Sequence, residues 1–223
     1  MKRALFILLA LAGIAVIPLV AQAPFEGIVE SNNSTMDDMG EMQRYTMTLR
    51  VKGEKARTDI SAFGSNPANL LIHRRDLGVV WVLDESKKTY FEMRMDGQEQ
   101  TGKEMKGSGD SKLKKTGKKR KILGYPCEQL IFRNGDVQTE YWGTKKLTSL
   151  ASTIARIFGA GESTEGISDA LASLGYFPMI ARTKLEGKVI EYSEVTKITR
   201  CALEDILFIV PADYHKESAP EMP

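Results

Sequence analysis

The sequence predicts a mainly β protein, with a wide curved antiparallel sheet (a half-barrel of about eleven strands) capped by two short helices. Two observations predict this fold. Most segments after residue 24 alternate apolar and polar residues or are rich in β-branched and aromatic residues, and short turn signals separate them. Two helical segments interrupt the series before its last strands. Because so wide a sheet must cover its apolar face or curl around it, we expect a partial barrel closed by the helices.

The first half of the chain is predicted to form strands joined by hairpins. In "RYTMTLRV", Tyr45, Met47, Leu49 and Val51 fall on one face and polar residues on the other, which is typical of a half-buried strand. Gly and Asp residues or paired lysines mark the turns between the strands that follow. These strands are "KARTDI" at 55–60, "NLLIHRR" at 69–75, "VVWVLD" at 79–84 and "TYFEMRM" at 89–95.

The second half begins with a strong hairpin signal in "CEQLIFRNGDVQTEYW", residues 127–142. Asn134 and Gly135 there favour the two positive φ angles of a type I′ turn. Amphipathic helices are expected in "LTSLASTIARIF" (147–158) and "STEGISDALASLG" (163–175) because their apolar residues recur at helical spacing. The last extended segments are "PMIARTKLE" at 178–186, "KVIEYSEVTKITR" at 188–200 and "LFIVPADY" at 207–214.

The N-terminus has the pattern of a secretory signal. Residues 1–23 contain a cationic start, an apolar stretch and a small-x-small ending at Ala21 and Ala23. We therefore expect a signal peptide at 1–23 and a single all-β domain with a helical cap at 24–223, exported to the periplasm or outside the cell. Pro24 disfavours cleavage directly before it, so the alternative is an uncleaved segment that anchors the protein.

The charge distribution argues against nucleic-acid binding. Lys2 and Arg3 account for the formal net charge of +2, so residues 24–223 have no net charge, whereas nucleic-acid backbones require a basic surface. Basic residues concentrate between Lys112 and Lys121, after a segment at about 95–112 whose composition predicts a flexible linker. Lysines in such a place blunt an exposed sheet edge, and they also suit a membrane surface with anionic head groups.

The residues that usually perform chemistry are scarce. The two histidines, His73 and His215, are not accompanied by a motif of a hydrolase or a metalloprotease, so we predict neither an enzyme nor a cofactor. The two cysteines, Cys127 and Cys201, leave two alternatives open. In an oxidising compartment they form either a disulfide, which stabilises the fold by ~4 kcal/mol, or two free thiols.

A methionine cluster suggests one metal site. Met36, Met39 and Met42 stand at regular spacing among acidic residues, and thioethers are soft ligands suited to Cu(I). The alternative is that these methionines lie in a loop and cover apolar surface.

The apolar face of the curved sheet is the other candidate site. If the sheet curves, it encloses a cavity for an apolar ligand, with Met47 and Trp81 as the strongest candidates for contact. The same residues also suit an ordinary packed core. The predicted lining consists of Tyr45, Met47, Leu49, Trp81, Leu83, Ile154 and Leu171.

Several motifs resemble a known family. "PFEGIVE", "VKGEKARTDI", "VVWVLDESKKTYFEM", "TGKKRKILGYPCEQLIF", "TEYWGT" and "LFIVPADY" are similar to the bacterial exported domain-of-unknown-function family 4412, from about Phe25 to Tyr214. That family in turn resembles the periplasmic lipoprotein carriers of the Lol type. The resemblance implies a half-barrel that binds a lipid or another apolar ligand without catalysis. The alternative is an interaction or structural module of the cell envelope with a protein partner.

Overall fold

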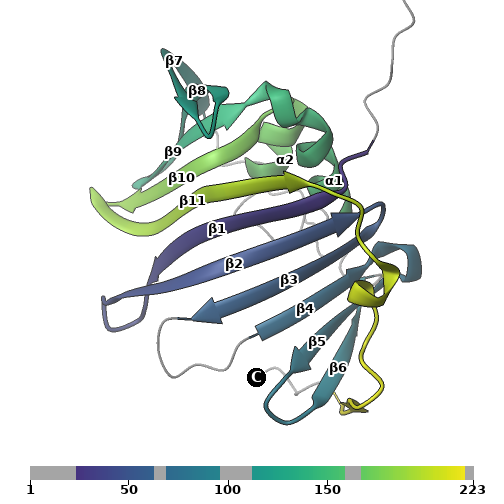
Figure 1. Ribbon diagram of the computed structural model, residues 1–223. Helices are drawn as coiled ribbons and strands as arrows, with labels where there is room; N and C mark the ends of the chain where they lie inside the picture. The colour runs from purple at the N-terminus through teal and green to yellow at the C-terminus, as the bar shows by residue number, and fades with distance from the viewer. Residues whose placement is uncertain (1–23, 63–68, 96–111, 159–166, 219–223) are drawn as a thin grey trace, which may run out of the picture.

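The computed structural model describes residues 24–62, 69–95, 112–158 and 167–218, and in these twelve strands form one sheet (Figure 1). The predicted signal at 1–23 and most of the predicted linker lie outside the described residues. The first strands are β1 (Gly27–Met36), β2 (Met42–Lys52), β3 (Lys55–Ala62), β4 (Asn69–Arg74), β5 (Val79–Asp84) and β6 (Thr89–Arg94). The later strands are β7 (Lys112–Ile122), β8 (Tyr125–Asn134), β9 (Val137–Thr144), β10 (Phe177–Leu185), β11 (Lys188–Arg200) and β12 (His215–Lys216).

The sheet is open and almost wholly antiparallel. Its strand order is β12-β6-β5-β4-β3-β2-β1-β11-β10-β9-β8-β7, and only the two-residue β12 pairs in parallel, with β6. β7 and β12 lie at the two ends of this order, so the sheet does not close into a barrel. The predicted fold class is therefore confirmed.

Both helices lie on one face of the sheet, here named the inner face (Figure 1). α1 (Thr148–Phe158) follows the 3-10 helix η3 (Lys145–Leu147) and buries Leu150 and Ile157 in one cluster with Leu49 and Val51 of β2. α2 (Ile167–Ser173) places Leu171 in a second cluster with Leu130 and Tyr141. The predicted cap thus forms because each helix has one apolar side to bury.

The C-terminal residues cover the opposite, outer face, and they correct one prediction. Residues 201–214, here named the strap, place Leu203, Phe208 and Tyr214 against Leu70 and Ile72. "LFIVPADY" is not an extended strand, because the 3-10 helix η5 (Asp205–Phe208) contains its first two residues. Side chains bind the backbone of the strap in place of a neighbouring strand: Glu26 accepts from the Leu203 amide, and Arg74 donates to the Phe208 carbonyl.

The turns also differ from the prediction. Asn134 is the last residue of β8, and in the turn that follows only Gly135, at φ 57°, has a positive φ, as in a type II′ turn. The type I′ pattern occurs instead between β7 and β8, where Leu123 and Gly124 have φ of 49° and 81°. A leucine rarely adopts this left-handed conformation because its Cβ approaches the following carbonyl.

Replacing Leu123 by asparagine should therefore stabilise the protein. Leu123 is 47% exposed, so the substitution removes little buried apolar surface, and asparagine tolerates positive φ. We expect the free energy of unfolding to rise by about 1 kcal/mol. Urea unfolding of Leu123→Asn measures it, with Leu123→Ala as the control that keeps the strain. A midpoint for Leu123→Asn no higher than that of the wild type would contradict this account of the turn.

His73 is a core residue beneath the end of α1. It is 2% exposed, and its ring centroid lies 4.3 Å from that of Phe158. Within the described part of the chain its Nδ1 atom has no hydrogen-bond partner. Burial lowers the pKa of His73 from 6.5 to about 4, so the imidazole is neutral in the folded protein at neutral pH.

This histidine should make stability depend on pH. The unfolded chain binds a proton near pH 6.5 and the folded protein only near pH 4. The contribution of the neutral His73 to the free energy of unfolding is therefore complete above pH 6.5. It is lost as the pH falls to 4, which lowers the free energy of unfolding by about 3 kcal/mol. Denaturant unfolding across this range should show that difference between wild type and His73→Leu. His215→Gln, which alters an exposed histidine, should keep the wild-type profile, and a His73→Leu profile parallel to wild type would refute the assignment.

Candidate functional site

The inner face bears a row of apolar side chains that are only half-buried. Directly paired residues of antiparallel strands project to the same face, so Met47 and Ile60 lie beside each other, as do Leu71 and Val82. We name as the inner row the half-buried apolar and aromatic residues of this face on β2 to β6: Tyr45, Met47, Ile60, Leu71, Val82 and Phe91.

The inner row continues from the core under α1. On β2, Val51 and Leu49 are 0% and 6% exposed, and both belong to the cluster that contains Leu150 and Ile157 of α1. Met47 and Tyr45 follow on the same face and are less buried. Burial therefore decreases along β2 with distance from the residues that α1 packs against.

The structure distributes the predicted cavity residues over three places. Tyr45 and Met47 lie in the inner row. Leu49 and Ile154 belong to the core under α1, and Leu171 belongs to the cluster under α2. Trp81 and Leu83 lie on the outer face, where they pack with Phe208 and Tyr214 of the strap.

Trp81 has contacts of its own on that outer face. Its Nε1 donates to the Glu92 carboxylate at 2.9 Å, and the Arg74 guanidinium lies 5.7 Å from the centroid of its ring. Such contacts are typical of a structural tryptophan whose polar edge has found a partner.

Ile60, Leu71, Val82 and Phe91 were not among the predicted cavity residues. Strand pattern alone could not select them, because a one-residue error in register moves a side chain to the opposite face. In "NLLIHRR", Leu70 and Ile72 point to the outer cluster, and Leu71 between them points to the inner face. Reading the pairing outward from Met47 leads to Ile60, and reading it outward from Leu49 leads through Thr58 to Leu71, Val82 and Phe91.

Polar groups cross the middle of the inner face, on β1, β11, β10 and β9. Asn33 and Ser31 are buried and hydrogen-bonded to each other, and Thr183 donates to the Glu191 carboxylate at 3.3 Å. Burial, with a contribution from Glu191, raises the pKa of Tyr141 to about 12 despite an opposing hydrogen bond from Thr139. Burial and Glu191 also raise the pKa of Tyr45, so both phenols stay neutral and can donate hydrogen bonds.

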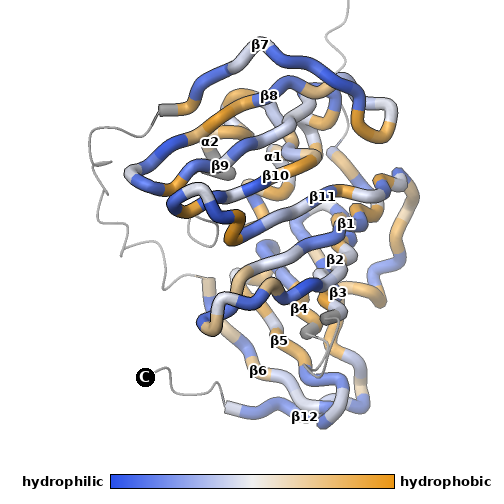
Figure 2. Tube along the Cα trace, turned by 90° about the vertical axis from the view of Figure 1, so that its left-hand side faces the viewer, coloured by the Kyte–Doolittle hydropathy of each residue, from blue (hydrophilic) through white to orange (hydrophobic). Residues whose placement is uncertain are grey.

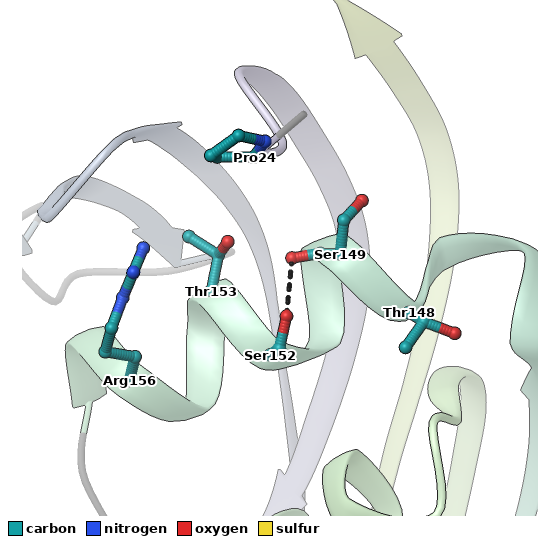
Figure 3. Close-up of a pocket in the computed structure, with 6 residues that line it drawn as sticks. All are labelled: Pro24, Thr148, Ser149, Ser152, Thr153 and Arg156. Atoms are coloured by element: carbon teal, nitrogen blue, oxygen red, sulfur yellow. Dashed lines mark hydrogen bonds between the residues drawn. The ribbon is translucent and has the colours of Figure 1, made fainter. Parts of the chain in front are cut away.

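A hollow of about 380 Å³ lies over the exposed side of α1 (Figure 3). It is lined by Thr148, Ser149, Ser152, Thr153, Arg156 and Pro24. Ser152 donates to the Ser149 carbonyl at 3.1 Å, and Arg156 donates to the Gly53 carbonyl at 3.2 Å. Its hydroxyls lack a histidine or carboxylate in the lining, so the lining offers no general base.

The predicted copper ligands lie at the tip of the β1–β2 hairpin. Met36 and Met42 are cross-strand partners, and Met39 lies in the connecting turn with 83% of its surface exposed. Asp37 shapes this turn by accepting hydrogen bonds from the Met39 and Glu41 amides. Across the described ranges, no group of three or more His, Cys, Asp or Glu side chains is placed to hold a metal ion.

The two cysteines do not form the disulfide that was one of the two alternatives. Both are free thiols. Cys127 lies in the core cluster under α1, whereas Cys201 packs against the outer cluster at the start of the strap. The second alternative, two free cysteines, is therefore the one that the structure shows.

These features define a class of protein: an open, single-sheet β fold with helices on one face and a strap on the other. The model of the family described as "Domain of unknown function (DUF4412)" matches residues 25–214, so the chain belongs to this family, as the motifs predicted. The comparison with curated protein sequences gave no significant match. No helix among the described residues is long and apolar enough to cross a bilayer.

Solved structures provide further similarities. An uncharacterized conserved protein from Thermus thermophilus aligns with a TM-score of 0.51 at 13% identity, over 87% of this chain and 91% of that one, which shows a similar fold alone. PNGF-II aligns with a TM-score of 0.42 at 15% identity, over 88% of this chain and 31% of that one. A LolA superfamily protein from Nitrosomonas europaea aligns with a TM-score of 0.36 at 10% identity, over 84% and 91%. The last two scores are too low to support a functional argument.

Proposed function

We propose that this chain is an exported protein of the cell envelope, in the periplasm or outside the cell. It binds the acyl chain of a lipid or another apolar ligand along the inner row and performs no chemistry. The inner row is the observation that supports this proposal most, because it places half-buried apolar side chains from five consecutive strands on one face.

The chemistry of the row suits a flexible apolar chain. Met47 has an adaptable side chain that fits ligands of variable shape, while Val82 and Phe91 offer rigid contacts. Each methylene group transferred from water to such a surface contributes about 0.8 kcal/mol. Tyr45 within the row, and the polar groups around Asn33 and Glu191 beside it, are placed to hydrogen-bond the polar end of the same ligand.

The first test is to identify what the protein binds. Native mass spectrometry of protein purified from its own envelope, followed by solvent extraction, should find a lipid or acyl species in defined stoichiometry. A protein that is recovered empty and binds no fluorescent fatty acid would refute the proposal and favour the alternative, an interaction or structural module with a protein partner.

A pair of methionine variants tests where the ligand binds. Met47→Gln introduces a polar amide into the inner row and should weaken fatty-acid binding about four- to fifteenfold, the equivalent of one or two lost methylene contacts. Met42→Gln is the matched control: it makes the same change on the same strand, but on the opposite face. Equal affinities for the two variants would place the ligand elsewhere.

Cu(I) binding is a second candidate function, favoured by the pairing of Met36 with Met42 beside Met39 at one hairpin tip. Titration with Cu(I) in the presence of a competing chelator should show uptake that is lost when all three methionines are replaced by leucine. Met93→Leu, at another exposed methionine, is the control. Uptake by the triple variant equal to that of the wild type would eliminate this site.

A further inference from the structure

A pocket of about 420 Å³ lies where the end of β7 and the start of β8 meet η3. Five cationic residues line it: Lys119, Arg120 and Lys121 from β7, and Lys145 and Lys146 from η3. We name it the basic pocket. Tyr176, which is 1% exposed, belongs to its lining.

The strand order brings these two groups of cations together. β7, β8 and β9 are consecutive antiparallel strands, so the end of β7 lies beside the start of β8, which lies beside the end of β9. The last residues of β7 and the residues that follow β9 therefore lie near each other. Thr144 caps η3 by accepting a hydrogen bond from the Lys146 amide. This cap fixes where η3 begins, and therefore where Lys145 and Lys146 lie. β7 is the edge strand at one end of the sheet, and Figure 2 shows it as a largely hydrophilic strand there.

The positive charge of the basic pocket is largely uncompensated. Glu128 is the one carboxylate in its lining, and it already accepts a hydrogen bond from the Tyr176 hydroxyl while its Oε1 lies 3.7 Å from Lys119 Nζ. In the part of the chain that the structure describes, no carboxylate lies within ion-pair distance of Arg120, Lys121, Lys145 or Lys146.

Aromatic rings hold several of these cations without neutralising them. The Arg120 guanidinium lies 4.1 Å from the centroid of the Trp142 ring, and Lys145 Nζ lies 4.9 Å from that of Tyr176. Lys115 Nζ also lies over Tyr176, at 5.4 Å. A cation over a ring keeps its full charge and loses less freedom when an anion arrives.

We propose that the basic pocket binds a phosphate group, either as a free phosphate ester or as the head group of an anionic lipid. A phosphate offers several oxygens and up to two negative charges to cations that approach from two chain segments, which a single carboxylate cannot match. The site is separate from the inner row, and its first probe contains no acyl chain. Its failure is therefore distinguishable from a failure of apolar-ligand binding.

Titration calorimetry with inorganic phosphate and glycerol 3-phosphate, and co-sedimentation with phosphatidylglycerol or phosphatidylcholine vesicles, test the proposal on the full chain. The double variant Lys145→Gln/Lys146→Gln should weaken binding tenfold or more. Lys114→Gln/Lys118→Gln is the matched control, because it removes the same charge from exposed positions of β7 outside the pocket and should change affinity less than twofold.

The outcomes separate the two sources of phosphate. Binding of the soluble phosphates identifies a free ester, whereas binding to phosphatidylglycerol vesicles alone identifies a lipid head group. Both results support the proposal if the pocket variant loses affinity and the control does not. Absence of binding to every probe, or equal losses in the two double variants, would overturn it.

Discussion

The pairing of β1 with both β2 and β11 is the interaction on which the rest of the structure depends. It joins β2 to β6 on one side with β11, β10 and β9 on the other, and so makes one sheet. The strands approach closely at its start: a Cβ on Gly27, at φ 150°, would lie 2.1 Å from the Thr199 carbonyl oxygen. Only glycine fits there, and the width of the sheet follows from that junction.

A sheet this wide has two faces that need cover, and the chain covers them with different elements. The helices follow β9 and bury the inner face, α1 near β2 and α2 over β8 and β9, whereas the strap follows β11 and seals the outer face over β4 and β5. The two edges of the sheet are also protected from pairing with another chain in different ways. β12 pairs with β6 at one edge, and β7 blunts the other with lysines, which are strongly hydrated and disfavour pairing with another chain.

The sequence was sufficient for the parts of this fold that depend on local pattern. Alternation in "RYTMTLRV" and apolar spacing in 147–158 predicted β2 and α1 correctly, because each element buries one side. It was insufficient where register or long-range contact decides. Trp81 and Leu83 looked equivalent to Met47, but the pairing of β4 with β5 and the strap place them on the outer face. The strap itself has strand-like residues, and side-chain hydrogen bonds from distant positions, such as Arg74, determine its irregular course.

The inner row and the basic pocket also depend on strand register and long-range contact rather than on local pattern. The distance between these two sites has a physical consequence. β2, at the border of the inner row, and β9, beside the basic pocket, are four positions apart in the strand order, which corresponds to about 19 Å at the usual spacing. This is more than twice the Debye length of about 8 Å at physiological salt. Salt therefore largely screens the charges of the pocket from a charged group that is bound in the inner row. The sheet thus combines an apolar surface and a charged one, and the polar groups on β1, β11 and β10 lie between them.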